Sequence, residues 1–323
     1  MGSSEVNRDD VQSYPLIGSI QNTVGMGFIG NQAVFAVANA LGARTICAPT
    51  TYASAHGGFS GRSNWVADPQ VFRKDVAFLI SQQPAVLIIG YVPRPNLIDI
   101  IATQLTDYKG VVLLDPVIGD YQKGLYVSPE TARAIRDQLM PLAQIVTPNR
   151  FEAEVLLGAG GDQDISEHSF LNGMFDLGAQ AVIITSYERD AEKHRIKTLF
   201  TNGYSYHRIG APYYPTFPAH GVGDVFAGGV GVFMALGASP FAATLLATTL
   251  CARSVANTTA YGGATVDPVA ALEKWRPLGY QVDDDRTMRF CERSMVESEA
   301  IKATAYDGPR LKFAPPKHKI IYG

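Results

Sequence analysis

Few cysteines, no cluster of basic residues and no long apolar run set the first limits on this sequence of 323 residues. Its three cysteines, Cys47, Cys251 and Cys291, lie far apart in the chain. So small and odd a number excludes a disulfide framework, and the spacing matches no zinc motif. We therefore expect buried thiols in a reducing compartment.

Acidic and basic residues nearly balance, with 27 Lys and Arg against 30 Asp and Glu. This balance provides no basic surface for nucleic acid, and no block of Lys and Arg indicates an anionic membrane. No apolar run reaches the length of a membrane span, and residues 1–13 are polar and unlike a signal peptide. We therefore expect a cytoplasmic protein that binds small molecules rather than nucleic acid or a membrane.

Hydrophobic residues make up 46% of the chain, which is enough for a substantial core. Short apolar runs alternate with longer segments of helical period, the pattern of a parallel sheet with crossover helices. The sequence thus predicts an α/β fold with three α/β/α layers, a mostly parallel central sheet and ligands outside the carboxyl ends of its strands. The expected strands are residues 16–21, 45–49, 85–90, 111–115, 144–147 and 181–186, with a hairpin at 195–200 and 204–209. The expected helices are residues 31–41, 69–82, 96–108, 129–139, 150–157, 166–177, 223–236 and 240–259.

No internal repeat and no Gly/Ser linker divides the chain, so one domain over residues 14–278 is the economical interpretation. Residues 1–13 form a polar N-terminal segment. From residue 279 the composition turns to mixed charges, and we treat residues 279–323 as a C-terminal extension of unknown role. A packed surface arm, a partner contact and partial disorder remain alternatives for it.

A glycine turn followed by a carboxylate, Gly221-Val222-Gly223-Asp224, precedes a long apolar segment of helical period. Free backbone N–H groups at a helix start favour a phosphate or the charge that develops during its transfer. Glycine allows close approach, and Asp224 is placed to accept a proton from an attacking hydroxyl. A glycine turn capped by Asp is the structural alternative for this short motif.

Four further motifs stand in order before this turn. Residues 19–31 read Ser-Ile-Gln-Asn-Thr-Val-Gly-Met-Gly-Phe-Ile-Gly-Asn, residues 114–120 read Leu-Asp-Pro-Val-Ile-Gly-Asp, residues 146–154 read Val-Thr-Pro-Asn-Arg-Phe-Glu-Ala-Glu, and residues 184–186 read Ile-Thr-Ser. Together with the glycine turn they resemble the pyridoxal kinases of the ribokinase superfamily, over roughly residues 14 to 275.

The resemblance implies ATP-dependent phosphorylation of the 5′-hydroxymethyl group of pyridoxal, and of pyridoxine or pyridoxamine, by a homodimer with a ribokinase-like fold. It implies that Gly221, Val222 and Gly223 donate N–H groups to the transferring phosphate and that Asp224 is the catalytic base. Most relatives have threonine where this chain has Val222. Backbone donation survives that change, but a hydroxyl contact is lost.

The same resemblance implies cation and nucleotide-phosphate contacts at Asp115 and Asp120, which flank a Pro-Val-Ile-Gly turn and offer the oxygens that hard cations prefer. Asn149 and Glu152 match the Asn-x-x-Glu element that holds magnesium and its waters beside the triphosphate. For either aspartate, capping of a local turn is the structural alternative.

Thr147, Thr185 and Ser186 end or follow expected strands. They resemble positions that contact ATP or, together with Asp115, a monovalent cation, which implies potassium as well as magnesium. Capping is the structural alternative for a threonine at a strand end.

Four residues resemble the substrate side of the family's site. Asn22 replaces a serine that contacts the pyridine substituents, and an amide can still donate and accept there. His56 is kept from the family's loop, whereas Gly57 replaces its threonine. Tyr91 matches the aromatic residue that packs on the pyridine ring. A structural role is the alternative for a lone histidine or tyrosine.

Two other functions stay open at this point. A hydroxymethylpyrimidine kinase shares the fold and the glycine turn, but a cysteine often occupies the position of Asp224 in that family. A pseudokinase that binds a B6 vitamer or nucleotide and signals through its tail is supported only by the substitutions at Asn22, Gly57 and Val222.

Overall fold

The computed structural model describes residues 14–159, 166–217, 220–263, 265–273, 281–282, 288–289 and 302–305. The predicted N-terminal segment 1–13 and most of the predicted extension 279–323 lie outside these ranges. The predicted division into segments therefore stays a prediction.

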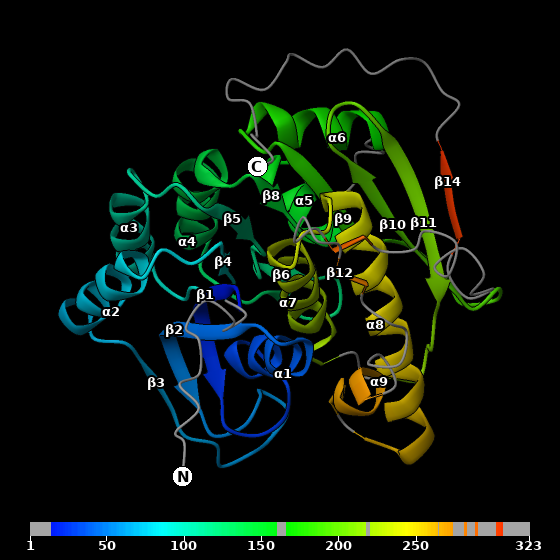
Figure 1. Ribbon diagram of the computed structural model, residues 1–323, viewed down its shortest axis with the longest axis horizontal. Coiled ribbons are helices and arrows are strands. Elements are labelled where there is room, and N and C mark those ends of the chain that lie inside the picture. The colour runs from blue at the N-terminus through cyan, green and yellow to red at the C-terminus, as the bar shows by residue number, and fades with distance from the viewer. Residues whose placement is uncertain are drawn as a thin grey trace, which may run out of the picture.

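A ten-stranded sheet forms the centre of the described chain, in the order β14-β11-β10-β9-β8-β5-β4-β1-β2-β3 (Figure 1). The strands from β9 to β2 in this order run parallel, while β10, β11, β14 and β3 are antiparallel additions at the two edges. The predicted parallel centre is confirmed. The strands are β1 (Leu16–Val24), β2 (Arg44–Ala53), β3 (Asn64–Val66), β4 (Val86–Ile89), β5 (Val111–Leu114), β8 (Ile145–Val146), β9 (Ala181–Asp190), β10 (Arg195–Thr201), β11 (Tyr206–Pro212) and β14 (Lys302–Ala305).

Helices cover both faces of this sheet and make the three predicted layers (Figure 1). The helices are α1 (Asn31–Leu41), α2 (Pro69–Ser81), α3 (Pro95–Gln104), α4 (Pro129–Ala134), α5 (Arg150–Leu156), α6 (Glu167–Asp176), α7 (Val222–Ala235), α8 (Pro240–Tyr261) and α9 (Val269–Glu273). Residues of α2 to α6 share one core cluster with the sheet, and residues of α1, α7, α8 and α9 share the other.

The central strands are continuous apolar runs because both of their faces are buried. In β4, Leu87 and Ile89 belong to the core under α2 to α6, whereas Val86 and Ile88 belong to the core under α1 and α7. This alternation follows from the two-residue period of a strand. It also explains why these strands could be recognised from their apolar runs alone.

Helix starts follow local sequence signals. Asp68 caps α2 by accepting hydrogen bonds from the N–H groups of Gln70 and Val71, at 2.9 and 3.1 Å, and Pro69 is the first helical residue. Ser128 and Ser239 cap α4 and α8 in the same way, each followed by proline. These signals place the starts of the three helices at the predicted residues.

Helix α7 packs unusually close to its neighbours. A Cβ atom added to Gly231 would lie 2.7 Å from Cδ1 of Ile88 on β4, and one added to Gly228 would lie 3.3 Å from Cα of Val34 on α1. Glycines therefore let the helix approach the sheet and α1. The approach brings the start of α7 to the carboxyl end of the parallel strands.

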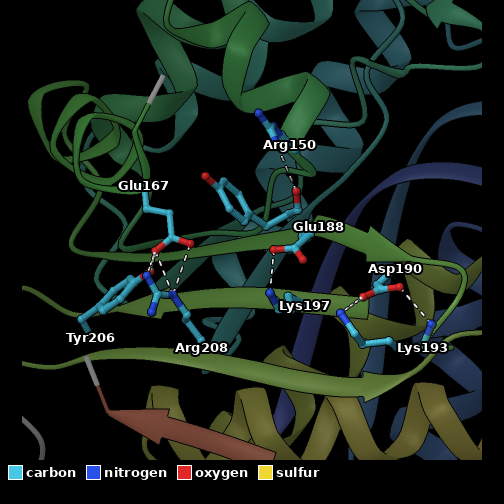
Figure 2. A network of polar contacts seen from close by, with 9 residues as sticks. Arg150, Glu167, Glu188, Asp190, Lys193, Lys197, Tyr206 and Arg208 are labelled. Atoms are coloured by element: carbon cyan, nitrogen blue, oxygen red, sulfur yellow. Dashed lines mark hydrogen bonds and ion pairs between the residues drawn. The ribbon is translucent and has the colours of Figure 1, made fainter. Parts of the chain in front are cut away.

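Polar contacts tie α6 to the antiparallel strands (Figure 2). Glu167 on α6 accepts hydrogen bonds from Nε and Nη2 of Arg208 on β11, at 2.9 and 2.6 Å, and from the Tyr206 hydroxyl. On the β9–β10 hairpin, Lys197 pairs with Glu188 at 2.6 Å. Because exposed ion pairs contribute little stability, these contacts chiefly fix the geometry of the hairpin edge.

Several elements were not predicted. They include the edge strand β3, the short hairpin of β6 (Gly119–Asp120) and β7 (Gly124–Leu125), and α9. The predicted helix 129–139 ends as α4 at Ala134 and continues as one π-helical turn, Ile135–Leu139. Strands β12 (Gln281–Val282) and β13 (Met288–Arg289) pair with each other, and β14 pairs with β11, so residues 302–305 of the predicted extension belong to the central sheet.

No helix within the described ranges combines the length and the apolar character that a membrane span requires.

Two phenylalanines of α2 test the assignment of its buried face. Phe72 is fully buried, whereas Phe78 is 62% exposed. Phe72→Ala should lower the free energy of unfolding by about 3–5 kcal/mol, because it leaves a cavity in the core. Phe78→Ala, its matched control, should change it by less than about 0.5 kcal/mol. Urea unfolding measures both, and equal losses in the two variants would contradict this packing.

Candidate active site

The turn before α7 offers backbone N–H groups that no side chain caps. Gly221 is the N-cap residue, with φ of 82°, and makes no side-chain capping hydrogen bond. A Cβ atom added here would lie 2.4 Å from the carbonyl oxygen of Phe28, so the left-handed turn and its close packing both require glycine. The N–H groups of Val222 and Gly223 lie in the first turn of α7. Such a helix start is suited to an anion.

Asp224 lies in the same first turn, partly buried. Burial raises its pKa to about 6, although the N–H groups of Gly30 and of Asp224 itself act in the opposite direction. A carboxylate with such a pKa is largely ionised at neutral pH and is more basic than an exposed one. It can therefore accept a proton.

Asp115 follows β5 and faces the start of α7. Its Oδ2 atom lies 3.9 Å from the position of a Cβ atom added to Gly223. Burial, together with the charges of Glu152 and Asp224, raises its pKa well above the usual range. The structure thus brings three carboxylates close enough to disfavour one another's ionisation.

Glu152 and Asn149 form a clamp on the turn after β5. The two residues make a capping box at the start of α5, in which Glu152 Oε2 accepts from the Asn149 N–H at 2.9 Å. Glu152 Oε1 accepts from the N–H groups of Ile118 and Gly119, at 2.9 and 3.4 Å. Asn149 Nδ2 donates to the Gly119 carbonyl at 2.9 Å. Their polar groups are therefore engaged by the protein itself.

The clamped turn is strained. Val117, inside it, has φ of 44°, a conformation that a β-branched residue rarely adopts. The hydrogen bonds from Ile118 and Gly119 to Glu152 hold the chain directly after this residue. Burial raises the pKa of Glu152 to about 7, against the lowering effect of these backbone donors. The clamp therefore fixes the backbone just past Asp115.

Asp120 is engaged in the β6–β7 hairpin. Its Oδ1 atom accepts from the N–H groups of Gln122 and Lys123, at 2.8 and 2.7 Å, and its Oδ2 atom accepts from the Tyr126 hydroxyl. Burial raises the pKa of Asp120, but these hydrogen bonds outweigh it and leave the pKa below its usual value. Both carboxylate oxygens thus serve the hairpin in this structure.

Thr147 carries a buried hydroxyl beside Asp115. It lies close enough to lower the pKa of Asp115, yet it makes no regular hydrogen bond to any group in the described part of the chain. A buried polar atom without a partner is unusual and calls for a ligand or water. Within the described ranges, no three His, Cys, Asp or Glu side chains form a ready-made metal cluster. A cation here would need substrate oxygens as well.

Thr185 and Ser186 lie in β9, next to the start of α5. Thr185 forms a bridge with Asn149, and its hydroxyl donates to the Pro148 carbonyl at 3.4 Å. Ser186 has φ of 49°, another rare conformation for a residue other than glycine. Tyr187 follows Ser186, and its ring centroid lies 5.0 Å from the Cζ atom of the Arg150 guanidinium. Thr185 and Ser186 thus lie beside Asn149, at the start of α5.

On the predicted substrate side, Asn22 lies against Gly30. A Cβ atom added to Gly30 would lie 2.1 Å from the Asn22 carbonyl oxygen and 2.5 Å from its Oδ1 atom. Because the Gly30 N–H acts on Asp224, this contact places Asn22 near the carboxylate. Tyr91 follows β4, and its carbonyl accepts from the Thr50 hydroxyl at 2.7 Å.

His56 packs on His220, the residue before the glycine turn. Their ring centroids lie 4.4 Å apart, and His56 Nδ1 accepts from the Gly58 N–H at 3.1 Å. Burial and the nearby Lys123 charge lower the pKa of both histidines, which favours neutral rings. Gly57 is exposed, and a Cβ atom added to it would meet nothing within 4 Å.

Sequence reasoning singled out neither Gly30, Asn31 nor His220. His220 directly precedes the glycine turn, so its place beside the site could have been inferred from that spacing. Gly30 and Asn31 reach the site through hydrogen bonds and backbone contacts, which leave no periodic signal in the sequence.

A family model described as phosphomethylpyrimidine kinase matches residues 30–270. The pyridoxal kinase PdxY of Deinococcus radiodurans is 29% identical over 244 residues, which cover 70% of this chain and 82% of the relative. The pyridoxal kinase PdxY of Leifsonia xyli subsp. xyli is 26% identical over 219 residues, covering 65% and 77%.

Among solved structures, the pyridoxal kinase of Staphylococcus aureus in complex with AMP-PCP and pyridoxal gives a TM-score of 0.72 at 20% identity. The match covers 91% of this chain and 100% of that one, and it shows the fold. The family match spans far more than half of the sequence and includes the glycine turn and all the carboxylates described above. This chain belongs to the phosphomethylpyrimidine kinase family.

Proposed function

We propose that this protein is a vitamin B6 kinase, which transfers the γ-phosphoryl group of ATP to the 5′-hydroxymethyl group of pyridoxal, and of pyridoxine and pyridoxamine. The observation that carries the proposal is Asp224, a carboxylate with a pKa of about 6, next to uncapped backbone N–H groups. The relatives named pyridoxal kinase, and the S. aureus complex with AMP-PCP and pyridoxal, support this substrate pair.

In the proposed reaction, the vitamer hydroxyl gives its proton to Asp224 while its oxygen bonds to the γ-phosphorus. The bond from that phosphorus to the bridging oxygen of ATP breaks, and ADP leaves with the electron pair. The N–H groups at Gly221, Val222 and Gly223 stabilise the charge on the phosphoryl oxygens. Asn22, His56, Gly57 and Tyr91 are proposed to surround the vitamer ring.

Magnesium and potassium fit the residues around Asp115. The buried carboxylate of Asp115 and the buried Thr147 hydroxyl beside it offer the oxygen ligands that such cations prefer. We assign Asp115 and Thr147 to direct contact, with Thr185 and Ser186 beside the nucleotide. A bound cation would neutralise charge on the triphosphate.

Asn149, Glu152 and Asp120 are proposed to act differently from Asp115. Because the oxygens of Glu152 and Asp120 already accept backbone or tyrosine hydrogen bonds, we assign both to shaping the phosphate side and to its negative potential. Asn149 holds the same turn through Gly119. A contact between Glu152 and magnesium would pass through water.

A coupled assay of ADP release with magnesium, ATP and each B6 vitamer tests the function. Preference for hydroxymethylpyrimidine over pyridoxal would instead favour a hydroxymethylpyrimidine kinase. Vitamer binding without turnover would favour a pseudokinase. We also propose a homodimer, which light scattering tests.

Asp224→Asn should lower kcat by roughly a hundredfold to ten-thousandfold, because an amide does not accept the substrate proton. The kcat/KM of wild type should fall below a pH of about 6, where Asp224 becomes protonated, and this acid limb should vanish in the variant. Asp176→Asn, at an exposed aspartate, is the control. An acid limb that persists in Asp224→Asn would show that another group is the base.

The carboxylate cluster predicts how pH and magnesium affect stability. Folding raises the pKa of Glu152 from 4.5 to about 7 and that of Asp224 from 3.8 to about 6. The folded state therefore binds these protons more tightly, and this stabilisation, complete below pH 4, is lost as pH rises through 6 to 7.

Asp115→Asn, which removes one charge of the cluster, should therefore raise the melting temperature more at pH 8 than at pH 5. Magnesium with ADP should stabilise wild type at pH 8 more than ADP with EDTA does, and this gain should shrink in the variant. Calorimetry provides the melting temperatures. A magnesium effect of equal size in Asp115→Asn would remove Asp115 from the cation site.

The substrate side gives a test of specificity. Asn22→Ser with Gly57→Thr recreates the contacts usual in relatives, and a gained polar contact is worth about 1–3 kcal/mol when buried. The double variant should shift kcat/KM toward pyridoxal and leave KM for ATP within about twofold. Added bulk at Gly57 meets no neighbour, so the melting temperature should hold. An unchanged ranking of vitamers would refute the assignment of this loop.

A further inference from the structure

A fully buried polar network lies at the start of α1. Asn31, Ser19 and Gln21 are at most 2% exposed. Asn31 Oδ1 accepts from the Ser19 hydroxyl at 2.6 Å, and Gln21 Nε2 donates to the same hydroxyl at 2.8 Å. Asn31 Nδ2 donates to the Gln21 carbonyl at 3.1 Å and to the Thr23 hydroxyl at 2.9 Å. Both hydrogens of the amide are thus used.

The network spans an irregular stretch of β1. Between Gln21 and Thr23, β1 advances two residues while its partner β2 advances three, from Pro49 to Tyr52. Asn22 lies in this interval. Irregular pairing of this kind re-aims side chains and is common next to active sites. Because the amide of Asn31 binds one group on each side of Asn22, it fixes the course of the chain through that residue.

The same stretch reaches the catalytic carboxylate. Thr23 bridges to Gly30, the residue before Asn31, and Gly30 packs directly on the Asn22 backbone. The Gly30 N–H in turn acts on Asp224. A short chain of contacts therefore runs from Asn31 through Thr23 and Gly30 to Asp224, and through Gln21 and Thr23 to Asn22.

Packing alone gives no reason for this network. The buried face of α1 is otherwise apolar, with Ala33, Val34, Val37, Ala38 and Leu41. Hydrogen-bonded amides and hydroxyls in a core add little stability beyond that of apolar side chains of similar shape. They do specify one geometry when every partner is present. The network therefore serves mainly to hold the backbone of residues 19–31 in one arrangement.

We propose that Asn31 is a positioning residue that holds the substrate side, at Asn22, and the Gly30 contact of the base, at Asp224, in one fixed arrangement. The proposal rests on the kinase function proposed above. Asn31 is itself fully buried. It acts through the backbone on either side of Asn22 and through Gly30.

The test compares Asn31→Ala with Thr244→Ala in wild-type and Asp224→Asn backgrounds. Thr244 is likewise fully buried and hydrogen-bonded, within α8, and it has no part in the proposed site. Asn31→Ala should lower kcat and raise KM for pyridoxal, each by roughly tenfold to a hundredfold, since small displacements of reacting groups carry losses of that size. KM for ATP should change by less than about twofold, and Thr244→Ala should leave all three constants within about twofold.

Coupling distinguishes positioning from general destabilisation. In the Asp224→Asn background, Asn31→Ala should lower kcat by less than about twofold further, because the base it positions is already absent. Equal losses in both backgrounds, or a loss matched by Thr244→Ala, would overturn the proposal. Thr23→Val removes a single acceptor of the amide and should give a smaller loss of the same kind, which keeps the test valid if Asn31→Ala does not fold.

Hydrogen exchange separates this proposal from the kinase function. Asn31→Ala or Thr23→Val should speed amide exchange in residues 19–31 and leave α8 unchanged. A wild-type protein that phosphorylates no vitamer would refute the kinase function. Unchanged exchange in residues 19–31 would refute the positioning role, whatever the activity.

Discussion

Mutual repulsion among buried carboxylates is the constraint around which the site is built. Asp115, Glu152 and Asp224 gather at the carboxyl end of the parallel strands, and burial raises the pKa of each. Separating them would relieve the repulsion. The fold instead holds Glu152 with backbone N–H groups and holds Asp224 at a helix start, where partial positive charge favours an anion. These backbone contacts offset part of the repulsion and keep the three carboxylates together.

Backbone strain accompanies this electrostatic cost. Val117 and Ser186 adopt left-handed conformations, one two residues after Asp115 and the other where the pairing of β9 with β10 is irregular. Such residues persist only where surrounding structure determines them, and they cluster at functional sites. Here the capping box of α5 supplies that surrounding structure for Val117. A motif that ordinarily caps the start of a helix thus also shapes the loop after a neighbouring strand.

Local signals account for the parts of the fold that the sequence predicted. Apolar runs such as residues 86–89 and 111–114 mark strands buried on both faces, and Asp68-Pro69 or Ser239-Pro240 mark helix starts. Short elements such as the β6–β7 hairpin were missed because two residues carry no period. The placing of residues 302–305 against β11 depends on contacts far apart in the chain, which no local pattern encodes.

The site was predicted unevenly for the same reason. Motif order identified the glycine turn and Asp115, and the structure brings them together. The order of the motifs did not reveal that Glu152 and Asp120 accept hydrogen bonds from backbone N–H groups of nearby loops. Such partners are set by tertiary packing. Residues 19–31 were recognised as a motif, but the hydrogen bonds that join its members to Asn31 were not predicted, because tertiary packing sets them.

Gly57 lies at the surface of the candidate site, where there is room for a side chain. It is exposed, and a side chain there would meet no atom within 4 Å. A change at this position alters the surface beside His56 without disturbing the core or the carboxylate cluster. With the proposed role of Gly57 in the vitamer pocket, substrate recognition could change at this residue without a change in the folded core.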